Sequence, residues 1–388
     1  MVTVFCVCLA VVVYVYFGYP LLLRMGAFGA RREFATGNEQ PLISVLVAAH
    51  NEEPTIETKL KNLLACDYPR ERMEILIGSD GSSDRTEEIV RPYAAEGVGL
   101  ISFPRQQGKS AMQNGLVAAS SGAILVFTDA DCFFAPGAIP RLVAAFADPS
   151  VGLVTGRPRY ENESESRICA NESLYLRYET WLREQESARG LLAMASGSLF
   201  AMRRSLWKRL DANVGDDFVL PLRVIEAGYK NILDPHVIAA TRLEQCESDS
   251  LLALKIRIIS KDFKALLTLR ELLNPLRYGA VAMGLCSHKL LRWLIPHFLL
   301  TLLVGNFFLL ANPLFRMALA IQGAAFALAS IGAIFGNKRQ GIFAHTSQLW
   351  SLPLSFCVVN LAALIGTVKC LAGYTSGQWK PERKHSPA

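Results

Sequence analysis

The stretch GAILVFTDADCFF, residues 122–134, places two aspartates, Asp129 and Asp131, directly after an apolar run. The apolar run predicts a buried strand, so both acids follow at its carboxyl end. Two like charges this close disfavour each other's ionised form. Either a positive group lies between them or one of them faces away, and the surrounding sequence has to decide which.

Three earlier apolar runs also predict strands. PLISVLVAAHNE (41–52) and RMEILIGSDGSSD (72–84) end in polar residues, and VGLISFP (98–104) is the third. Stretches with helical spacing separate the runs. This alternation predicts an α/β domain with a mostly parallel sheet over residues 33–250. Ligands bind beyond the carboxyl ends of the strands in such sheets. The polar residues expected there are His50, Asn51, Glu52, Asp80, Asp129 and Asp131.

The composition indicates that the chain also has membrane-spanning segments. The chain of 388 residues is 51% hydrophobic and only 19% charged, with a mean hydropathy of +0.27. Uncharged runs cover residues 2–23, 293–315, 317–335 and 349–368. Each run is about long enough to cross a bilayer, which takes roughly 17–25 residues. We therefore expect an N-terminal transmembrane anchor (1–24) and about three C-terminal transmembrane helices (293–371).

The basic residues predict how the chain meets the bilayer. No basic residue precedes the first run, and Arg24, Arg31 and Arg32 follow it. This pattern favours an uncleaved anchor over a signal peptide and predicts that the α/β domain lies in the cytoplasm. Residues 251–292 have apolar and basic residues at helical spacing, which predicts amphipathic helices facing anionic lipid rather than nucleic acid. A basic tail, 372–388, ends the sequence, and the sequence leaves open on which side of the membrane it lies.

The paired aspartates have two interpretations. Asp favours turns, so a plain turn would account for the pair. At the carboxyl end of a strand, however, two carboxylates can hold Mg²⁺ or Mn²⁺, hard cations that bring substrate phosphates with them. A metal ion between them would relieve their repulsion. Nine cysteines without a paired C-x-x-C give neither a zinc site nor a disulfide framework.

Other motifs extend this picture. Asp80 before Gly81 suits a turn or, opposite Asp129, a nucleobase or ribose contact. The sequence GKS is not a P-loop, because Phe103 stands where the motif needs its first glycine. Lys109 still suits a nucleotide at the start of a helix. In VGDDFVLPL, Asp216 suits the helix dipole, and a second acid, Asp217, is more than a helix start needs and is a candidate general base.

Taken together, these motifs resemble the family-2 glycosyltransferases of the GT-A fold. The resemblance is to the membrane-bound branch related to cellulose, chitin, hyaluronan and poly-N-acetylglucosamine synthases. It covers almost the whole chain, through YFGYPLLL, VAAHNE, SDGSSD, GKSAMQNG, FTDAD, ASGSLFAMRRSLW, GDDFVLPLRVIEAGY, NPLR and SHKLLRWLIPHF. The motifs come in the order and spacing of the family. They do not identify the sugar that is transferred.

The resemblance implies a role for each matching residue. Asp80 would contact the uracil or ribose of a nucleotide sugar near His50, Asn51 and Glu52. Lys109 and Asp129 would sit by the nucleotide, and Asp131 would ligate Mg²⁺ or Mn²⁺. Asp217 would be the base that deprotonates the acceptor. Lys255, Arg257 and Gly197 would lie near the diphosphate or the acceptor.

One departure from the family pattern concerns chain extension. Processive members carry a Q-x-x-R-W motif on an interface helix. The matching stretch, LLALKIRIISKDF, keeps Lys255 and Arg257 but has neither the Gln nor the Trp. The resemblance therefore does not decide between single transfer and processive extension.

The sequence thus predicts an inverting, metal-dependent hexosyltransferase of polysaccharide or cell-envelope biosynthesis. It would be a multi-pass protein of the inner or plasma membrane that uses a nucleotide sugar, expected to be UDP-linked, and a lipid-linked or glycan acceptor. Two alternatives stay open: a catalytically silent membrane subunit of a polysaccharide synthesis or export complex, and a nucleotidyltransferase.

Overall fold

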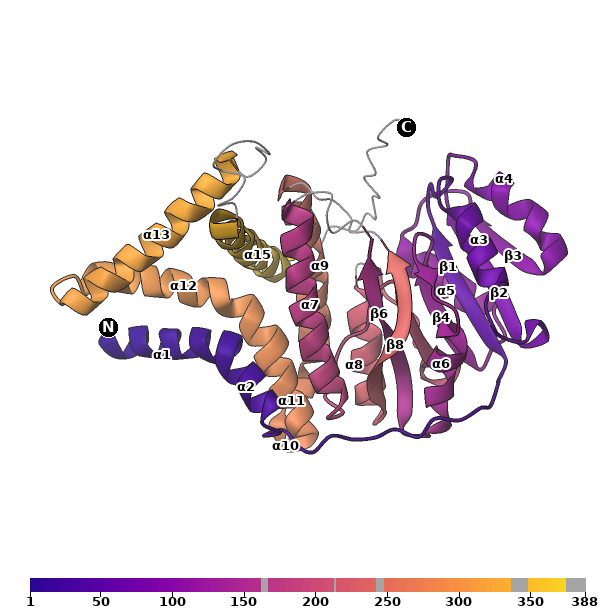
Figure 1. The fold of residues 1–388 in the computed structure, drawn as a ribbon, viewed down its shortest axis with the longest axis horizontal. Coiled ribbons are helices and arrows are strands. Elements are labelled where there is room, and N and C mark those ends of the chain that lie inside the picture. Colours follow the sequence, from indigo (N-terminus) through magenta and orange to yellow (C-terminus); the bar gives the residue numbers. More distant parts are fainter. Residues whose placement is uncertain (162–166, 213, 242–247, 336–347, 375–388) are drawn as a thin grey trace.

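One eight-stranded sheet organises the part of the molecule that carries the predicted acids, with the strand order β3-β2-β1-β4-β7-β6-β8-β5 (Figure 1). The computed structural model describes residues 1–161, 167–212, 214–241, 248–335 and 348–374, so most of the predicted basic tail lies outside the described residues. The strands are β1 (Ile43–Ala49), β2 (Met73–Asp80), β3 (Val98–Phe103), β4 (Ile124–Asp129), β5 (Phe133–Phe134), β6 (Val151–Tyr160), β7 (Leu199–Arg203) and β8 (Lys230–Thr241).

The sheet is parallel in one half and mixed in the other. β1 pairs in parallel with both β2 and β4, and β2 pairs in parallel with β3. β7 runs antiparallel to β4 and β6, whereas β8 is parallel to β6 and antiparallel to β5. Every residue of β1 is buried, as expected for a strand covered on both faces. The α/β domain predicted from the sequence is confirmed.

Helices cover both faces of the sheet. α3 and α6 pack on one face, and α5, α8 and α9 pack on the other. Gly97 ends the short helical turn Arg91–Glu96 that follows α4, with the left-handed backbone (φ 78°) that glycine adopts readily. The helices of this part are α3 (Ile56–Leu64), α4 (Thr86–Val90), α5 (Lys109–Ala119), α6 (Ala138–Ala144), α7 (Arg167–Ser187), α8 (Asp216–Glu226), α9 (Ser248–Thr268) and α10 (Pro275–Tyr278).

Four helical segments are long and apolar enough to cross a membrane: Val2–Arg24, Ala280–Phe308, Pro313–Ala333 and Leu352–Leu371. They confirm the expected anchor and three later helices. The first segment joins α1 (Val2–Val13) and α2 (Tyr19–Arg24) through a π-helical turn, and the second joins α11 (Ala280–Leu285) and α12 (Leu291–Phe308) in the same way. α13 (Pro313–Phe335) and α15 (Gln348–Leu371) complete the set, on the side of the molecule away from β1–β4 (Figure 1).

The helix bounds differ from the uncharged runs at the second segment. The run 293–315 is broken because Asn312 accepts a hydrogen bond from the N–H of Leu314 (3.0 Å) and Pro313 starts α13. The segment also begins earlier than residue 293, at Ala280. Residues expected at the membrane interface, such as His288, therefore lie within this segment.

A buried group of polar side chains, the polar joint, provides partners for the charged residues that lie within this apolar segment. The Tyr19 hydroxyl donates to Glu186 (2.7 Å), and His288 faces Glu186 with Nδ1 (2.7 Å) and Glu179 with Nε2 (3.2 Å). Arg292 donates to Glu179. The joint comprises these five residues, Tyr19, Glu179, Glu186, His288 and Arg292. It fixes α7 to two apolar segments, since breaking one contact would leave a buried charge unpaired.

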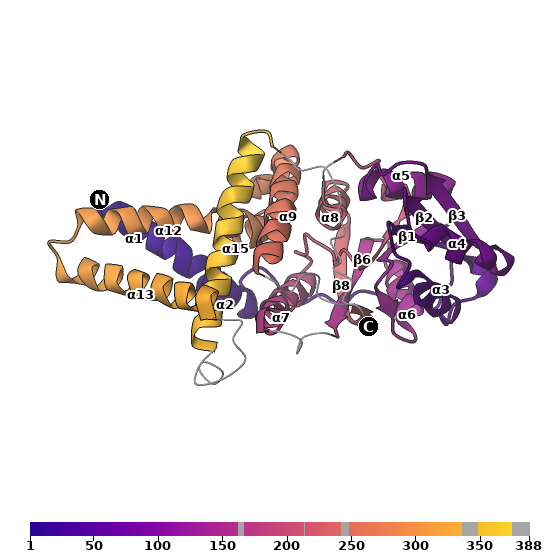
Figure 2. The same ribbon diagram turned by 90° about the horizontal axis from the view of Figure 1, so that it is seen from above.

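α9 lies between the sheet domain and the apolar helices. It runs beside α15, where the backbone of Gly366 faces Ile259 (Figure 2). At the start of α12, the Trp293 ring packs edge-to-face on Phe218 of α8 (5.6 Å) and Phe263 of α9 (6.0 Å). The apolar helices thus hold α8 and α9 next to the predicted site.

Candidate active site

β1, β2 and β4 end at one edge of the sheet, where the predicted donor-binding residues follow them. Ala49 faces Ser79 across β1 and β2, and Ala48 faces Asp129 across β1 and β4. His50 and Asp80 therefore lie at the same edge as Asp129. This edge is also the switch point of the sheet, because the chain adds β2 on one side of β1 and β4 on the other. Ligands bind at such switch points in open α/β sheets.

The loop after β1 is held to the loop after β2. His50 donates from Nδ1 to the carbonyl oxygen of Asp80 (2.7 Å), which fixes the ring tautomer. Asn51, with a left-handed φ of 55°, accepts a hydrogen bond from the N–H of Ser83 (2.8 Å). Glu52 is buried. The three residues thus shape this edge of the sheet through contacts with the second loop.

Asp80 is fully buried and binds the chain itself. Its two carboxylate oxygens accept the backbone N–H groups of Gln107 and Gly108, each at 2.8 Å. The carboxylate therefore sets the path of the loop that leads into α5. The backbone around Gly81 is equally tight, since a Cβ there would lie 2.5 Å from the backbone nitrogen of Gln106.

Lys109 is the positive group beside the paired aspartates. Its Nζ lies 2.8 Å from Asp129 and 3.6 Å from Asp216. Burial lowers the pKa of Lys109, but the two carboxylates outweigh it and raise the pKa overall. Burial raises the pKa of Asp129, against the effect of Lys109 and together with that of Asp131. The structure therefore brings together three predicted residues, Lys109, Asp129 and Asp131.

Helix α3 holds the loop that carries both aspartates, through two residues that sequence reasoning missed. The ammonium group of Lys59 is fully buried and donates to the Thr128 hydroxyl (2.9 Å) and to the carbonyl oxygen of Cys132. Asn62 bonds both the N–H (2.8 Å) and the carbonyl oxygen (2.9 Å) of Phe134. The loop is thus fixed immediately before and after its two acids.

The predicted base, Asp217, lies between two glycines. Its Oδ2 is 3.3 Å from the point that a Cβ on Gly197 would occupy, and its Oδ1 is 3.1 Å from the equivalent point on Gly215. Burial, followed by the neighbouring charge of Asp216, raises the pKa of Asp217 to about 6. A carboxylate of this pKa is a stronger base than an ordinary aspartate and is still mainly ionised at neutral pH.

The two acids of the GDD sequence differ in their contacts. Asp216 is buried and accepts a hydrogen bond from Gln113 Nε2 (2.6 Å), in addition to its ion pair with Lys109. Within the described residues, the Asp217 carboxylate makes no hydrogen bond or ion pair. Asp216 is therefore engaged by neighbouring side chains, whereas the Asp217 oxygens are not engaged within the described residues.

α9 contributes the predicted residues Lys255 and Arg257 from different sides. The Lys255 ammonium lies 4.9 Å from the centre of the Tyr175 ring on α7. Arg257 adds to burial in lowering the pKa of Lys261, while nearby carboxylates oppose it. One of those carboxylates is Asp262, which sequence reasoning also missed.

The structure constrains how a metal ion could bind. Within the described residues, no group of three or more His, Cys, Asp or Glu side chains is arranged to hold one. Two carboxylates suit only a cation that completes its shell with water and substrate phosphates, as Mg²⁺ and Mn²⁺ do.

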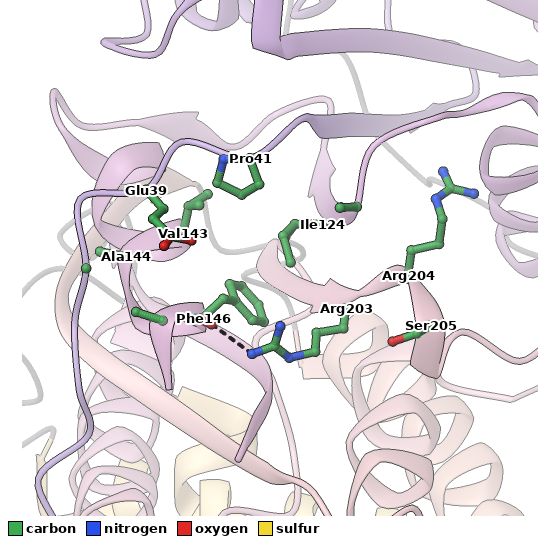
Figure 3. A pocket seen from close by; sticks show the side chains of 12 residues that line it. Glu39, Pro41, Ile124, Val143, Ala144, Phe146, Arg203, Arg204 and Ser205 are labelled. Carbon is green, nitrogen blue, oxygen red and sulfur yellow. Dashed lines mark hydrogen bonds between the residues drawn. The ribbon is translucent and has the colours of Figure 1, made fainter. Parts of the chain in front are cut away.

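A cavity of about 490 Å³ lies at the other edge of the sheet (Figure 3). Ile124, at the start of β4, lines it together with Glu39, Phe146 and Arg203. The guanidinium of Arg203 is already engaged by the carbonyl oxygens of Phe146 (2.8 Å) and Val151 (2.8 Å). The length of β4 separates this cavity from Asp129, so it is not part of the site.

Comparison with known proteins places this geometry in a family. The family model Glycosyl transferase family 2 matches residues 44–210. The probable glycosyltransferase YdaM of Bacillus subtilis is 30% identical over 230 residues, which cover 54% of this chain and 55% of the relative. A beta-monoglucosyldiacylglycerol synthase of Trichormus variabilis is 29% identical over 194 residues, or 47% of this chain and 41% of the relative. The chain thus spans about half the length of these curated relatives.

A solved structure shares the arrangement of sheet and helices. The mannosyltransferase PcManGT from Pyrobaculum calidifontis, in complex with GDP-Man and Mn²⁺, aligns with a TM-score of 0.72. The alignment covers 95% of this chain and 99% of that chain at 23% identity, which shows the fold. Fold, family match and four apolar helices agree with the resemblance seen in the sequence. Residues 44–210 thus match a glycosyl transferase family 2 domain, the fold is GT-A-like, and the chain also has helices long enough to span a membrane.

Proposed function

We propose that this protein is a membrane glycosyltransferase that moves a sugar, with inversion, from a nucleotide sugar to a hydroxyl group at the membrane surface. One observation carries the proposal. Asp217, unpaired within the described residues and with a pKa of about 6, opens α8 beside the Lys109–Asp129 pair in a family 2 domain. A candidate base for the acceptor therefore lies next to a positively charged group at the edge of the sheet where the donor would bind.

The reaction follows from these positions. Asp217 takes the proton of an acceptor hydroxyl while the acceptor oxygen bonds to the anomeric carbon of the sugar. The bond from that carbon to the nucleoside diphosphate breaks in the same step. Because the oxygen enters opposite the leaving group, a single displacement inverts the anomeric centre. General-base catalysis of this kind contributes about 10²–10⁴-fold.

The donor would be a UDP-sugar held at the edge formed by β1, β2 and β4. The loops fixed by His50 and Asp80 would shape the nucleoside site, and Lys109 would lie near the diphosphate. Asp131, with Asp129 beside it, would hold Mg²⁺ or Mn²⁺. When bound, such an ion neutralises the charge of the departing diphosphate. The GDP-Man and Mn²⁺ bound by PcManGT support a nucleotide sugar and a divalent metal as probes.

The acceptor would be lipid-linked. α9 lies beside the apolar helix α15 and carries basic side chains near Asp217, so an acceptor dissolved in the bilayer could present its headgroup to the base (Figure 2). The relative from Trichormus variabilis, by its name, makes a glycolipid. Together with Arg24, Arg31 and Arg32 after the first apolar segment, this supports a catalytic domain on the cytoplasmic face.

A screen of the purified full chain against UDP- and GDP-sugars, with product mass as the readout, tests the function. Asp217→Asn keeps the shape and removes the proton acceptor, so transfer should fall by about 10²–10⁴-fold. Nucleotide affinity with Mn²⁺ should change little. Asp216→Asn is the comparison variant and should be milder, because its carboxylate binds Gln113 and Lys109.

Two results would reject the assignment. One is that Asp216→Asn loses more activity than Asp217→Asn. The other is that Asp217→Asn loses nucleotide binding and transfer in parallel. Release of free pyrophosphate instead of a nucleoside diphosphate would indicate a nucleotidyltransferase.

A further inference from the structure

Two buried, ionisable side chains near Asp217 lack a partner within the described residues. Asp262 of α9 is 6% exposed and Arg183 of α7 is 8% exposed. Neither side chain forms a hydrogen bond or an ion pair within the described part of the chain, and Arg183 Nε is buried without any acceptor. An unpaired charge in the interior is costly, so two of them beside a third unpaired group require a reason.

Asp262 and Asp217 approach the same point. A Cβ on Gly215 would lie 2.7 Å from Asp262 Oδ1 and 3.1 Å from Asp217 Oδ1. The two carboxylates come from different helices, α9 and α8, and meet only in the folded chain. Burial, and then the charge of Asp217, raises the pKa of Asp262 well above its usual range.

Arg183 lies near Asp217, because its charge lowers the pKa of that carboxyl, yet within the described residues it makes no ion pair with Asp217 or Asp262. A buried guanidinium normally closes onto a carboxylate through two parallel hydrogen bonds. Arg183 of α7, Asp217 of α8 and Asp262 of α9 are called the acceptor cluster below. Trp293 packs on Phe218 and Phe263, the residues that follow the two acids, and keeps both helices in place.

We propose that Arg183 and Asp262, together with Asp217, bind the acceptor, and that its headgroup is neutral and carries at least two hydroxyl groups, as a glycosyl or glycerol group does. The inference rests on the proposed function and names its acceptor class. A hydroxyl suits the acceptor cluster because it donates to a carboxylate and accepts from a guanidinium. An ionised phosphate suits the cluster less, because its charged oxygens only accept hydrogen bonds and offer nothing to the carboxylates.

In this arrangement Asp217 faces the hydroxyl that attacks the sugar. Asp262 bonds a neighbouring hydroxyl of the same headgroup. Arg183 donates to the oxygens of the headgroup and so holds the attacking oxygen in line. Arg183 and Asp262 are acceptor-binding residues, and the proton goes to Asp217 alone.

Acceptor binding to the full chain in nanodiscs, loaded with UDP and Mn²⁺, tests the proposal without needing turnover. The probes are a short-chain diacylglycerol, its monoglucoside and a polyprenyl phosphate. Asp262→Asn and Arg183→Gln should each weaken binding of the monoglucoside by about 10–100-fold, the effect of losing one hydrogen bond to a charged group. Affinity for UDP with Mn²⁺ should stay as in the parent chain.

Two matched variants control for the change of charge. Glu271→Gln removes an exposed acid just after α9, and Arg177→Gln removes an exposed arginine of α7. Both should bind the monoglucoside as the parent chain does. Asp262→Asn should not lower the melting temperature, since it removes an unpaired buried acid. Arg183→Gln changes the same acceptor cluster from another helix, so it tests acceptor binding by itself if Asp262→Asn fails to fold.

The proposal is overturned if both variants bind the monoglucoside like the parent chain, or if the polyprenyl phosphate binds the parent chain more tightly than both neutral probes. Failure of the proposed function has a different signature. In that case the neutral probes bind and depend on Asp262 and Arg183 as expected, but no nucleotide sugar gives a product.

Discussion

At the scale of single residues, Lys59 shows what the pattern of a helix can reveal. It lies on the inward face of α3 with Ile56, Leu60 and Leu63, all of which are buried. A lysine at such a position is rare unless it has a partner. Its partners are backbone and hydroxyl oxygens that flank the two aspartates. The helical spacing contained this signal, but only the folded chain shows which loop the lysine holds.

Lys59→Met should weaken the response to metal while the fold survives. Methionine fills a similar volume in an apolar interior, so the main loss is the pair of hydrogen bonds to Thr128 and Cys132. The loop carrying Asp129 and Asp131 would then lose its support. We expect a higher Mn²⁺ concentration for half-maximal activity and about 1–3 kcal/mol lower stability, because two acceptors lose their donor.

The comparison variant is Lys61→Met, which removes an exposed lysine from the same helix. It should leave both the metal titration and the melting temperature unchanged. Identical metal titrations for Lys59→Met and Lys61→Met would contradict the role of Lys59.

The base should impose a pH dependence on the reaction. Asp217 works when ionised, so kcat/KM for the acceptor should rise with pH through about 6. Burial and Asp216 raise this pKa, with Asp129 also contributing, whereas Lys109 and Arg183 lower it. Asp262 of α9 faces the same group. Rates measured from about pH 5 to pH 8 at saturating donor should give this profile, and a flat profile would exclude Asp217 as the base.

The raised pKa of Asp217 also makes the stability of the folded chain depend on pH, in the direction opposite to its effect on activity. The pKa of Asp217 is higher in the folded chain than in the unfolded chain, so its contribution to stability is present at low pH and is lost as pH rises through about 6. Asp217→Asn should therefore melt at a higher temperature than the parent chain at pH 8, although it is less active. Thermal melts of both chains at about pH 5 and pH 8 measure the effect. A lower melting temperature at pH 8 would count against the burial of this charge.

At the scale of elements, the sequence predicts the parallel half of the sheet well and the mixed half poorly. β1, β2, β3 and β4 are short apolar runs separated by stretches with helical spacing, so their spacing alone locates them. β6 contains Gly152, Gly156 and Pro158, and β8 contains Pro235, residues that weaken the signal of a strand. These two strands form because each pairs with the other over almost its whole length.

The residues of the candidate site also divide into those that the sequence predicts well and those that it does not. Asp80, Lys109, Asp129 and Asp217 stand at the ends or starts of predicted elements, where a sequence pattern finds them. Asp262 lies within the basic stretch KIRIISKDFK, which predicts an interface helix and gives no sign of a buried acid. Only the packing of α9 against α8 brings it to Asp217. Whether the predicted residues bind the ligands assigned to them stays a prediction.

Trp293 should couple the apolar helices to the acceptor side of the site. It is 8% exposed, and its ring packs on Phe218 and Phe263. Trp293→Ala should cost about 3–5 kcal/mol of stability and raise the acceptor KM, because α8 and α9 lose a shared contact. Trp293→Phe should be much milder.

Melting temperature, acceptor KM and UDP affinity measured in parallel test this role. Phe308→Ala, at an exposed position of the same helix α12, is the control and should change none of the three. A loss of UDP affinity with an unchanged acceptor KM would show that Trp293 supports the donor side instead.

At the scale of the whole molecule, the polar joint connects the catalytic domain to the apolar helices. The polar joint ties α7 to the first and second apolar segments. α12 and α13 are themselves linked by a hydrogen bond from Asn306 to Gln322 (2.9 Å), a contact that is favourable between apolar helices. α13 is otherwise exposed along most of its length, as a lipid-facing helix is. The catalytic domain is therefore expected to sit at a fixed height over one membrane surface.

This arrangement predicts which parts of the chain lie on opposite sides of the membrane. The segment Ala280–Phe308 has 29 residues. As a helix it measures about 43 Å, more than the roughly 30 Å of a hydrocarbon core. Its first half, up to Trp293, lies beside the catalytic domain, because Trp293 packs on α8 and α9, and the segment ends at the turn before Pro313. That turn should reach the surface opposite the catalytic domain, which the arginines after the first segment place in the cytoplasm.

Cysteines added one at a time to the parent chain test the orientation in intact cells with a membrane-impermeant thiol reagent. Ala311→Cys, exposed in the turn between α12 and α13, should react from outside. Glu96→Cys, exposed on the catalytic domain, should react only after the membrane is permeabilised. The parent chain supplies the background, since it has an exposed cysteine, Cys6. Reaction of both variants from outside would mean that α12 does not cross the bilayer. Reaction of Glu96→Cys alone would invert the topology and rule out a cytoplasmic donor, because the edge that carries Lys109 and Asp129 would then face away from the cell's nucleotide sugars.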